Sequence, residues 1–304
     1  MGTVLLYYSY VAIPYPKQII KWQKKLCSTL NLRGRIRVAH EGISGTVGGS
    51  DLAINRYKKA MKESELFSNM DFNESRGDAS CFPRITVVEK KEIVHLGIDP
   101  AELPAPQKGT YLAPDELHTV LSHKPNSVVL LDVRNNYESR IGTFQGAITP
   151  NIRNFRDLPR YIDTHLDLFK DKDVIMFCTG GVRCPRAVAY LAKKGVSKTV
   201  AQIKNGICHY TDHYPDGFFR GKNYVFDYRV ALPINNDILT TCDLCPTPCD
   251  NYTNCLNGSC NKHFIACAHC LEAYQNSCSQ QCLSLIREQK VKTRPPFPKM
   301  NFSL

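Results

Sequence analysis

The stretch Val174-Ile-Met-Phe-Cys-Thr-Gly-Gly-Val-Arg-Cys184 decides the fold of the central part of this chain. Its first four residues are a continuous apolar run, which is typical of a strand buried on both faces of a parallel sheet. Cys178 follows the end of that strand, and Pro185 comes just before a helix that closes at Gly195. The stretch therefore predicts a strand, a tight loop that begins with a cysteine, and a helix.

Two further apolar runs indicate that this strand belongs to a parallel α/β domain. Residues 128–133 and 200–203 are also expected to be buried strands, and residues 115–121 have the pattern of a helix. Strands that alternate with helices in this way form parallel sheets. We expect the domain to span residues 109–233, after a proline-rich linker at residues 98–108.

The first 97 residues predict a separate α+β domain. The sequence indicates a strand at residues 4–13, a helix at 17–30, two short strands within 35–47 around a turn at 42–45, a helix from an N-cap at Asp51 to residue 66, and a last strand or strand pair at 85–88 and 93–96. This order is the ferredoxin-like arrangement. The expected fold class is therefore α/β, with a ferredoxin-like α+β domain ahead of the parallel α/β domain and a small Cys-rich segment after it.

The last part of the chain, residues 241–304, differs in composition because nine of the 14 cysteines lie between Cys242 and Cys282. Its end, from residue 291, is basic and rich in proline, which is typical of a loose tail. The start of the chain lacks the basic region of a secretory signal, and no apolar run reaches the ~18 residues of a membrane span. We therefore expect a cytoplasmic protein with no membrane partner, whose cysteines stay reduced and serve as metal ligands or nucleophiles.

The cysteine at the start of the central loop has the surroundings of a reactive thiolate. Gly180 and Gly181 allow the backbone to curl so that several N–H groups point inward, with the dipole of the following helix behind them. Such a nest lowers the pKa of a thiol, which makes Cys178 the candidate nucleophile, and Arg183 is expected to attract an anionic group of the substrate. The alternative is an inert buried cysteine. The candidate loop residues are Thr179, Gly180, Gly181, Val182, Arg183 and Cys184.

The spacing between Cys178 and Arg183 separates two kinds of chemistry. Cysteine-dependent phosphatases have five residues between the cysteine and the arginine, whereas this loop has four, and Cys184 stands where a phosphatase needs its arginine. The smaller loop favours a sulfur or oxygen species on Cys178 over a phosphoryl group. Cys184 either resolves a modified Cys178 as a disulfide or is a small residue that caps the following helix.

The cysteines of the last part have the spacing of metal ligands. Two Cys-x2-Cys pairs are far enough apart to meet across a hairpin or a short helix, which is the pattern of tetrahedral zinc sites. With His263 and His269 they could fill two such sites, and the metal would supply folding energy that so short a segment lacks. Reduced thiols without metal, disulfides formed on isolation and an iron–sulfur cluster are the alternatives. The candidate ligands are Cys242, Cys245, Cys249, Cys255, Cys260, Cys267, Cys270, Cys278 and Cys282.

Several motifs of the central part resemble those of rhodanese domains. The resemblance rests on Cys178-Thr-Gly-Gly-Val-Arg-Cys184 as the active-site loop, Leu131-Asp-Val-Arg134 with Glu138 as an upstream signature, Gly142-Thr-Phe-Gln-Gly-Ala147, and Asn205-Gly-Ile207 after the last core strand. It implies a rhodanese fold with Cys178 as the reactive residue. Asp132 and Arg134 are expected either to support the active loop through hydrogen bonds or to contact the substrate.

Three features together resemble a narrower family, the rhodanese-like tRNA uridine hydroxylases. They are His40-Glu-Gly-Ile-Ser-Gly-Thr46, the loop that starts at Cys178, and Asn223-Tyr-Val-Phe-Asp-Tyr-Arg229, and they extend the resemblance over nearly the whole chain. Local departures are Ser44, where many members have asparagine, and Tyr228. The resemblance implies a tRNA modification enzyme, an oxidoreductase that uses molecular oxygen to hydroxylate uridine 34 at its 5-position. The sequence shows no flavin, haem or nicotinamide motif that would identify a redox cofactor.

Two other functions fit parts of the sequence. A thiosulfate-type sulfurtransferase that carries a persulfide on Cys178 fits the loop at least as well, but it leaves the flanking domains without a use. A non-catalytic, zinc-organised RNA-binding module leaves the active loop without a use. The hydroxylase therefore explains the largest part of the chain.

Basic residues in the first domain are candidates for RNA contact. The chain has a formal net charge of +11, and nucleic acid is the commonest acidic partner of such proteins. Lys17, Lys21 and Lys24 lie near one face of the first helix, whereas Arg35 and Arg37 alternate along the next strand and share one side of it. We expect tRNA to be the partner of these residues, and a merely solvated face is the alternative.

A histidine near the glycine turn and four residues after the last core strand are further candidates. Loops at the carboxyl ends of parallel strands line the ligand crevice of such sheets. His40 is expected either to face this crevice or to be a structural side chain. His209, Tyr210, His213 and Tyr214 are expected either to stack on a base or relay a proton there, or to be structural.

Overall fold

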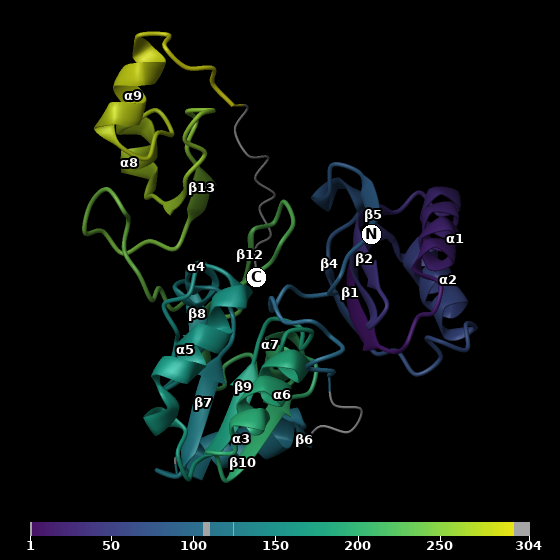
Figure 1. Ribbon diagram of the computed structural model, residues 1–304. Coiled ribbons are helices and arrows are strands. Elements are labelled where there is room, and N and C mark those ends of the chain that lie inside the picture. The colour runs from purple at the N-terminus through teal and green to yellow at the C-terminus, as the bar shows by residue number, and fades with distance from the viewer. Residues whose placement is uncertain (1, 106–109, 124, 295–304) are drawn as a thin grey trace.

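The computed structural model describes residues 2–105, 110–123 and 125–294, which form three regions (Figure 1). We refer to residues 2–97 as the N-terminal region, 110–233 as the central region and 241–294 as the Cys-rich region. Part of the expected linker, residues 106–109, and the expected tail from residue 295 lie outside the described residues. Within the described ranges, no helix combines the length and the apolar character that a membrane span requires.

The N-terminal region is a five-stranded sheet packed against two helices. Its elements are β1 (Gly2–Tyr10), α1 (Pro16–Thr29), β2 (Arg33–Ala39), β3 (Gly42–Ser50), α2 (Asp51–Lys62), β4 (Phe72–Arg76), the 3-10 helix η1 (Ala79–Cys81) and β5 (Ile85–Glu89). The sheet order is β4-β1-β3-β2-β5, in which the β2–β5 pair is parallel and the other pairs are antiparallel. The first four strands and the two helices confirm the ferredoxin-like arrangement.

The structure corrects the expected elements of this region. The strand that completes the ferredoxin-like sheet is β4, which the sequence analysis missed because Phe-Asn-Glu-Ser-Arg is polar, and β5 is an additional edge strand. The turn between β2 and β3 is at residues 40 and 41, so the glycines at 42 and 45 lie within β3. Ser50 caps α2 through the Ala53 N–H, so Asp51 is the first helical residue, and the helix ends at residue 62. Residues 93–96 form no strand.

The two faces of this sheet have different surroundings because side chains alternate along a strand. Leu5, Ile36 and Val38 are buried on the face that α1 and α2 cover. Arg35 and Arg37 alternate with those residues of β2 and therefore point from the opposite face. That opposite face is turned toward the central region, whereas α1 and α2 lie on the side away from it (Figure 1).

The central region is a parallel α/β domain, as the sequence predicted, but its sheet has a fourth strand, β6, that the sequence did not indicate, and helices cover both faces. Its elements are β6 (Thr110–Leu112), α3 (Pro114–His123), β7 (Val128–Asp132), α4 (Asn136–Ser139), β8 (Gly142–Phe144), η2 (Phe155–Asp157), α5 (Leu158–Thr164), η3 (Leu166–Leu168), β9 (Asp173–Phe177), α6 (Cys184–Lys194), β10 (Thr199–Ile203), α7 (Gly206–His213), β11 (Phe219–Tyr224) and β12 (Ala231–Pro233). The sheet order is β6-β10-β9-β7, and β8, β11 and β12 form a small antiparallel sheet. Val174 and Met176 of β9 belong to the cluster with α5 and α6, whereas Ile175 and Phe177 belong to the cluster with α3 and α7.

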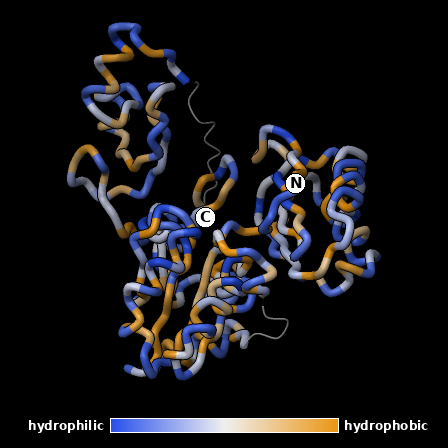
Figure 2. Tube along the Cα trace, viewed as in Figure 1, coloured by the Kyte–Doolittle hydropathy of each residue, from blue (hydrophilic) through white to orange (hydrophobic). Residues whose placement is uncertain are grey.

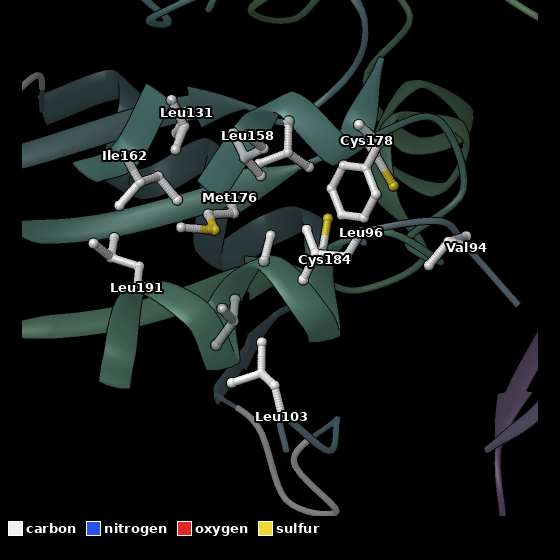
Figure 3. Packing of buried hydrophobic residues seen from close by; sticks show 14 of the residues in the cluster. Val94, Leu96, Leu103, Leu131, Leu158, Ile162, Met176, Cys178, Cys184 and Leu191 are labelled. Carbon is white, nitrogen blue, oxygen red and sulfur yellow. The ribbon is translucent and has the colours of Figure 1, made fainter. Parts of the chain in front are cut away.

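Hydrophobic residues follow the strands of the central region (Figure 2). Cys178 and Cys184 belong to the same buried cluster as Met176 (Figure 3). Leu96 and Leu103, which precede the central region in sequence, are buried in this cluster too. The segment at residues 98–108, which was expected to be a linker, is therefore anchored at Leu103. The boundaries between the domains stay a prediction.

Two buried arginines join the N-terminal sheet to the rest of the chain. Arg186 of α6 donates to the Glu41 carboxylate at 2.7 Å and to the Ile98 carbonyl at 2.6 Å. Arg229, which follows β11, donates to the Ser75 hydroxyl at 2.8 Å and to the carbonyl of residue 76 at 2.7 Å. Because a buried arginine that loses its partners is costly, these contacts hold the sheet in one position against the central region.

The Cys-rich region has little regular structure. It contains β13 (Tyr252–Asn254), β14 (His263–Ile265), α8 (Ala268–Ala273) and α9 (Gln280–Arg287). Cysteines make up half of its buried cluster, in which Phe264 and Ile265 are among the few large apolar side chains of this region. Tyr252 donates to the carbonyl of residue 137 at 2.8 Å, which attaches this region to the central region next to α4.

Candidate functional site

The loop after β9 places Cys178, fully buried, at the carboxyl end of a central strand. The N-terminus of α7 closes the loop, because the backbone N–H groups of Ile207 and Cys208 donate to the carbonyls of Cys178 and Thr179, both at 3.0 Å. Gly181 has a φ of +90°, in the left-handed range that favours glycine. The loop thus has the tight backbone path that the sequence predicted for a nest of N–H groups.

The surroundings of Cys178 favour its thiolate form. Burial raises the pKa of Cys178, but a hydrogen bond from the Cys184 side chain, the charge of Arg183 and backbone N–H groups of Arg183 and Gly181 outweigh burial and lower that pKa to about 6. Burial and the hydrogen bond to Cys178 raise the pKa of Cys184, so Cys184 stays a thiol and acts as the donor. At neutral pH the pair therefore consists of one thiolate and one thiol.

Arg183 is held by a partner to which the sequence analysis gave no role. Its two Nη atoms donate to the two carboxylate oxygens of Glu138, at 2.6 Å each, and both side chains are buried. Phe226 adds an aromatic ring 5.8 Å from the Arg183 guanidinium carbon. The sequence indicates this pairing with Arg183 only weakly. Glu138 stands three residues after Asn135, the spacing of a capping box at a helix N-terminus, and that role alone accounts for a glutamate at this position.

Asp132 and Arg134 lie away from the cavity that contains Cys178. Arg134 donates through Nη2 to the Asp132 carboxylate and to the Gly142 carbonyl, both at 2.6 Å, and both charged side chains are fully buried. Thr143 donates to Asp132 at 3.0 Å. The geometry favours support of the strand ends over contact with the substrate, and this role stays a prediction.

A cavity of about 510 Å³ opens next to Cys178, between the central region and the N-terminal sheet. Leu6 of β1 packs so closely on Gly180 that a Cβ at that glycine would lie 2.3 Å from the Leu6 side chain. Arg35 and Arg37 line the cavity, and burial together with the charges of Arg35 and the loop arginine lowers the pKa of Arg37. The volume is in the range of about 300–1,000 Å³ that suits one small ligand. The cavity therefore combines a thiolate with positive charge suited to an anionic substrate.

The structure separates the two sets of basic residues that the sequence analysis grouped as RNA contacts. Arg35 and Arg37 line the cavity of Cys178. Lys17, Lys21 and Lys24 belong to α1, on the other side of the N-terminal sheet. Contact of either set with RNA stays a prediction, but the two sets cannot bind the same nucleotides.

His40 and the four candidates of α7 and its end lie outside this cavity. His40 Nδ1 is 3.0 Å from the carbonyl of Ile13. The hydroxyl of Tyr210 is 2.9 Å from His118 Nδ1 and accepts the N–H of Phe218 at 3.1 Å. Among the residues of α7 that the structure describes, Cys208 is the one that lines the cavity, and burial raises its pKa to about 12. These contacts favour the structural alternative for the histidines and tyrosines.

The Cys-rich region gathers eight of its nine cysteines into two groups of four. Within each group the sulfur atoms lie within 4.8 Å of one another. The groups interleave along the chain, since the first and third pairs of cysteines form one group and the second and fourth pairs form the other. Cys249, His263 and His269 belong to neither group. The groups are Cys242, Cys245, Cys267 and Cys270, and Cys255, Cys260, Cys278 and Cys282.

The geometry of both groups fits a tetrahedral metal ion. Zn–S bonds of ~2.3 Å place the sulfur atoms of a tetrahedron ~3.8 Å apart. The Sγ atoms of Cys245 and Cys267 are 3.7 Å apart, and those of Cys260 and Cys278 are 3.6 Å apart. A backbone N–H donates to one sulfur atom of each group, to Cys242 and to Cys255, at 3.4 Å. Both groups could therefore hold a metal such as zinc.

Comparisons with family models match the three regions in order. The descriptions are UPF0176 acylphosphatase like domain for residues 2–93, rhodanese-like domain for residues 113–213, and rhodanase C-terminal for residues 220–283. Among solved structures, the rhodanese-like domain of an Anabaena protein is 20% identical, with 38% of this chain and 80% of that chain covered and a TM-score of 0.31. A thiosulfate sulfurtransferase from Pseudomonas aeruginosa is 24% identical, with 38% and 20% covered and a TM-score of 0.28.

Curated relatives match over nearly the whole chain. A protein named tRNA uridine(34) hydroxylase from Aster yellows witches'-broom phytoplasma is 39% identical, with 92% of this chain and 91% of its own covered. Proteins of the same name from Listeria welshimeri and Chlamydia abortus are 39% and 37% identical, with 92% and 91% of this chain and 88% and 86% of their own covered. These matches extend across the N-terminal, central and Cys-rich regions together. The chain belongs to the tRNA uridine(34) hydroxylase family.

Proposed function

We propose that this protein is a tRNA modification enzyme of the cytoplasm, an oxidoreductase that uses molecular oxygen to hydroxylate uridine 34. The observation that carries the proposal is the cavity of about 510 Å³ that Cys178, with its lowered pKa, lines together with Arg35 and Arg37. A nucleophile and fixed positive charge in one cavity suit a base that is attached to phosphates. The names of the relatives support the choice of base and position.

Cys178 acts as the nucleophile in this proposal. C6 of uracil is conjugated with the C4 carbonyl, so addition of a thiolate at C6 places electron density on C5, the carbon that gains oxygen. The hydrogen bond from Cys184, the charge of Arg183 and the loop N–H groups lower the pKa of Cys178 and keep it ionised at neutral pH. Arg35 and Arg37 hold the phosphates next to the target nucleoside.

The neighbouring thiol of Cys184 supplies the remaining electrons. Uridine and O2 give 5-hydroxyuridine and water only when two electrons and two protons are added, and oxidation of two thiols to a disulfide releases the same number. We propose that C5 takes up O2 as a hydroperoxide and that Cys184 removes its outer oxygen as a sulfenic acid. Loss of the C5 proton then expels Cys178 from C6. Cys178 displaces water from Cys184 to form the disulfide, which an external dithiol reduces.

Two zinc ions complete the protein in this proposal. Each is held by one of the two groups of four cysteines, and the fit of the sulfur distances supports this assignment. The Cys-rich region has few apolar side chains, so the metal supplies much of its cohesion.

Mass spectrometry of nucleosides tests the function directly. In tRNA from cells without the protein, the hydroxylated uridine at position 34 should be absent, and with ¹⁸O2 the purified protein should place one labelled oxygen in that nucleoside. Reduced protein without added dithiol should convert at most one uridine per chain and accumulate a disulfide between Cys178 and Cys184. Loss of a sulfur-bearing nucleoside would instead favour the sulfurtransferase, whose persulfide on Cys178 the enclosed loop also accommodates.

A further inference from the structure

A second and larger groove adjoins the cavity of Cys178. Its volume is about 1470 Å³, almost three times that of the cavity, and all three regions contribute to its walls. The groove and the cavity share Arg35, Phe82, Tyr137, Val225, Phe226 and Asp227. The groove therefore continues from the reactive thiolate toward the Cys-rich region, which lies beyond α4 (Figure 1).

Aromatic side chains of the central and Cys-rich regions form one wall of this groove. The ring of Tyr224 lies 5.2 Å from that of Tyr137 and 5.3 Å from that of Phe226. Tyr252 and His263 stack on each other with 4.3 Å between ring centroids. Phe226, at the boundary with the cavity, is 52% exposed. Tyr252 is buried and supports His263, whereas an exposed ring such as that of Phe226 is a platform on which a base of single-stranded RNA stacks.

Cations that form no close ion pair lie along the same groove. Arg35, Arg153 and Lys262 come from the N-terminal, central and Cys-rich regions in turn, and each is exposed. None of the three forms an ion pair with another described residue, in contrast to Arg140, which is paired with Asp243. Exposed cations from three regions that line one groove together with aromatic rings suit a chain of phosphates.

We infer that this groove binds the unpaired nucleotides next to the target uridine. Their bases stack along the wall that includes Phe226, and their phosphates lie against Arg35, Arg153 and Lys262. That the target is this uridine rests on the proposed function. The inference adds that the nucleotides next to the uridine bind in the groove. A protein helix would require a continuous apolar surface, and it would leave these cations without partners, so single-stranded RNA is the occupant that the groove fits.

The experiment measures binding of a seven-nucleotide single-stranded RNA with a central uridine to the full chain. Phe226→Ala is expected to weaken binding about tenfold, as the loss of one stacked base does. Arg153→Glu combined with Lys262→Glu is expected to weaken it at least as much and to reduce the slope of log affinity against log salt by roughly 0.7 for each lost phosphate contact. Matched controls outside the groove are Tyr15→Ala, an aromatic residue 68% exposed, and Lys17→Glu combined with Lys21→Glu, and neither should change the affinity more than about twofold.

A cross-link supplies a second readout that does not depend on a variant. RNA that carries 4-thiouridine beside the central uridine should attach to residues 224–226 or 252–263. Attachment elsewhere, or equal affinities of the groove variants and the parent, overturns the inference. If the parent protein does not bind this RNA, the inference is also overturned, and a protein partner becomes the candidate occupant of the groove. The melting temperature and the metal content of each variant show whether it has folded.

This test separates the groove from the reaction, because binding requires no turnover. If the RNA binds in the groove and no hydroxylated uridine forms, the proposed function fails and the groove stands. If Phe226→Ala and the Arg153 and Lys262 variant hydroxylate tRNA at the parent rate and bind the short RNA normally, the groove proposal fails and the function stands.

Discussion

Both carboxylate oxygens of Glu138 accept a hydrogen bond from Arg183, at 2.6 Å each, in a pair that water scarcely reaches. The pair joins α4 to the loop of Cys178. The positive charge that helps to lower the pKa of Cys178 is therefore held in place by an acid outside the loop.

Glu138→Gln is expected to lower the free energy of unfolding by about 3–5 kcal/mol, because it leaves Arg183 as a buried cation without a counter-charge. Denaturation by urea measures the change. Glu288→Gln is the matched control, since the pair between Glu288 and Lys290 is largely exposed and should contribute less than about 1 kcal/mol. Equal stabilities of the two variants would contradict the importance of the buried pair.

Cys178→Ser is expected to abolish hydroxylation while the fold stays intact. A serine hydroxyl is not ionised at neutral pH, whereas the pKa of Cys178 is lowered to about 6. Hydroxyuridine formation on tRNA measures activity, and the melting temperature and metal content check the fold. Appreciable turnover by a correctly folded serine variant would rule out a thiolate mechanism.

The reactivity of Cys178 is expected to rise with pH around a midpoint near 6, because the thiolate is the species that reacts. Cys184→Ala removes a hydrogen bond that lowers the pKa of Cys178 and leaves the effect of burial in place. The midpoint should therefore move to higher pH, and the rate at pH 6 should fall. Alkylation by iodoacetamide, followed by mass spectrometry of the Cys178 peptide from pH 4 to 9, gives both curves. Identical midpoints would show that Cys184 does not stabilise the thiolate.

Lys17, Lys21 and Lys24 on α1 offer a test of RNA contact outside the groove. Replacing all three with glutamate is expected to weaken binding of whole tRNA strongly and to flatten its dependence on salt, because fewer counterions are released. Binding of the seven-nucleotide RNA should not change, since the cavity lies between the sheet and the central region, whereas α1 lies on the other side of the sheet. Equal tRNA affinities and salt slopes would show that this face is merely solvated, and residues 290–294 would be the next candidates.

The central fold and its loop could be predicted because their signals are local. The apolar run of β9, the cysteine after it and Pro185, which is the second residue of α6, lie within a dozen residues, so the strand, the loop and the start of the helix are indicated by local sequence alone. The polar strand β4 could not be predicted, since its pairing with β1 depends on residues about 70 positions apart rather than on its own composition.

The full site depends on contacts between distant segments. Glu138 lies 45 residues before Arg183, and Arg186 lies 145 residues after Glu41, so no spacing in the sequence indicates either pair. The alternation of side chains in β2 was evident, but not which face the central region would cover. The sequence therefore predicted that Arg35 and Arg37 lie on the same side of β2, but not that this side lines the cavity.

The grouping of the cysteines could not be predicted from spacing, because many sets of four are compatible with nine candidates. The structure selects two interleaved groups and leaves out Cys249, which lies in neither. Interleaved sites share the chain segments between them, so loss of one metal should loosen the other.

Purified, reduced protein is therefore expected to contain two zinc ions per chain. Cys242→Ser and Cys260→Ser should each lose at least one, because each removes a ligand from a different group. Cys249→Ser is the matched control and should keep both zinc ions.

Chelation of the zinc should increase hydrogen exchange in residues 241–294 more than in the central region, because only the Cys-rich region depends on metal for its cohesion. It should also weaken binding of the short RNA, since Cys260 and Lys262 line the groove. Elemental analysis that finds no metal in protein kept reduced throughout, or equal metal loss in all three variants, would contradict this assignment.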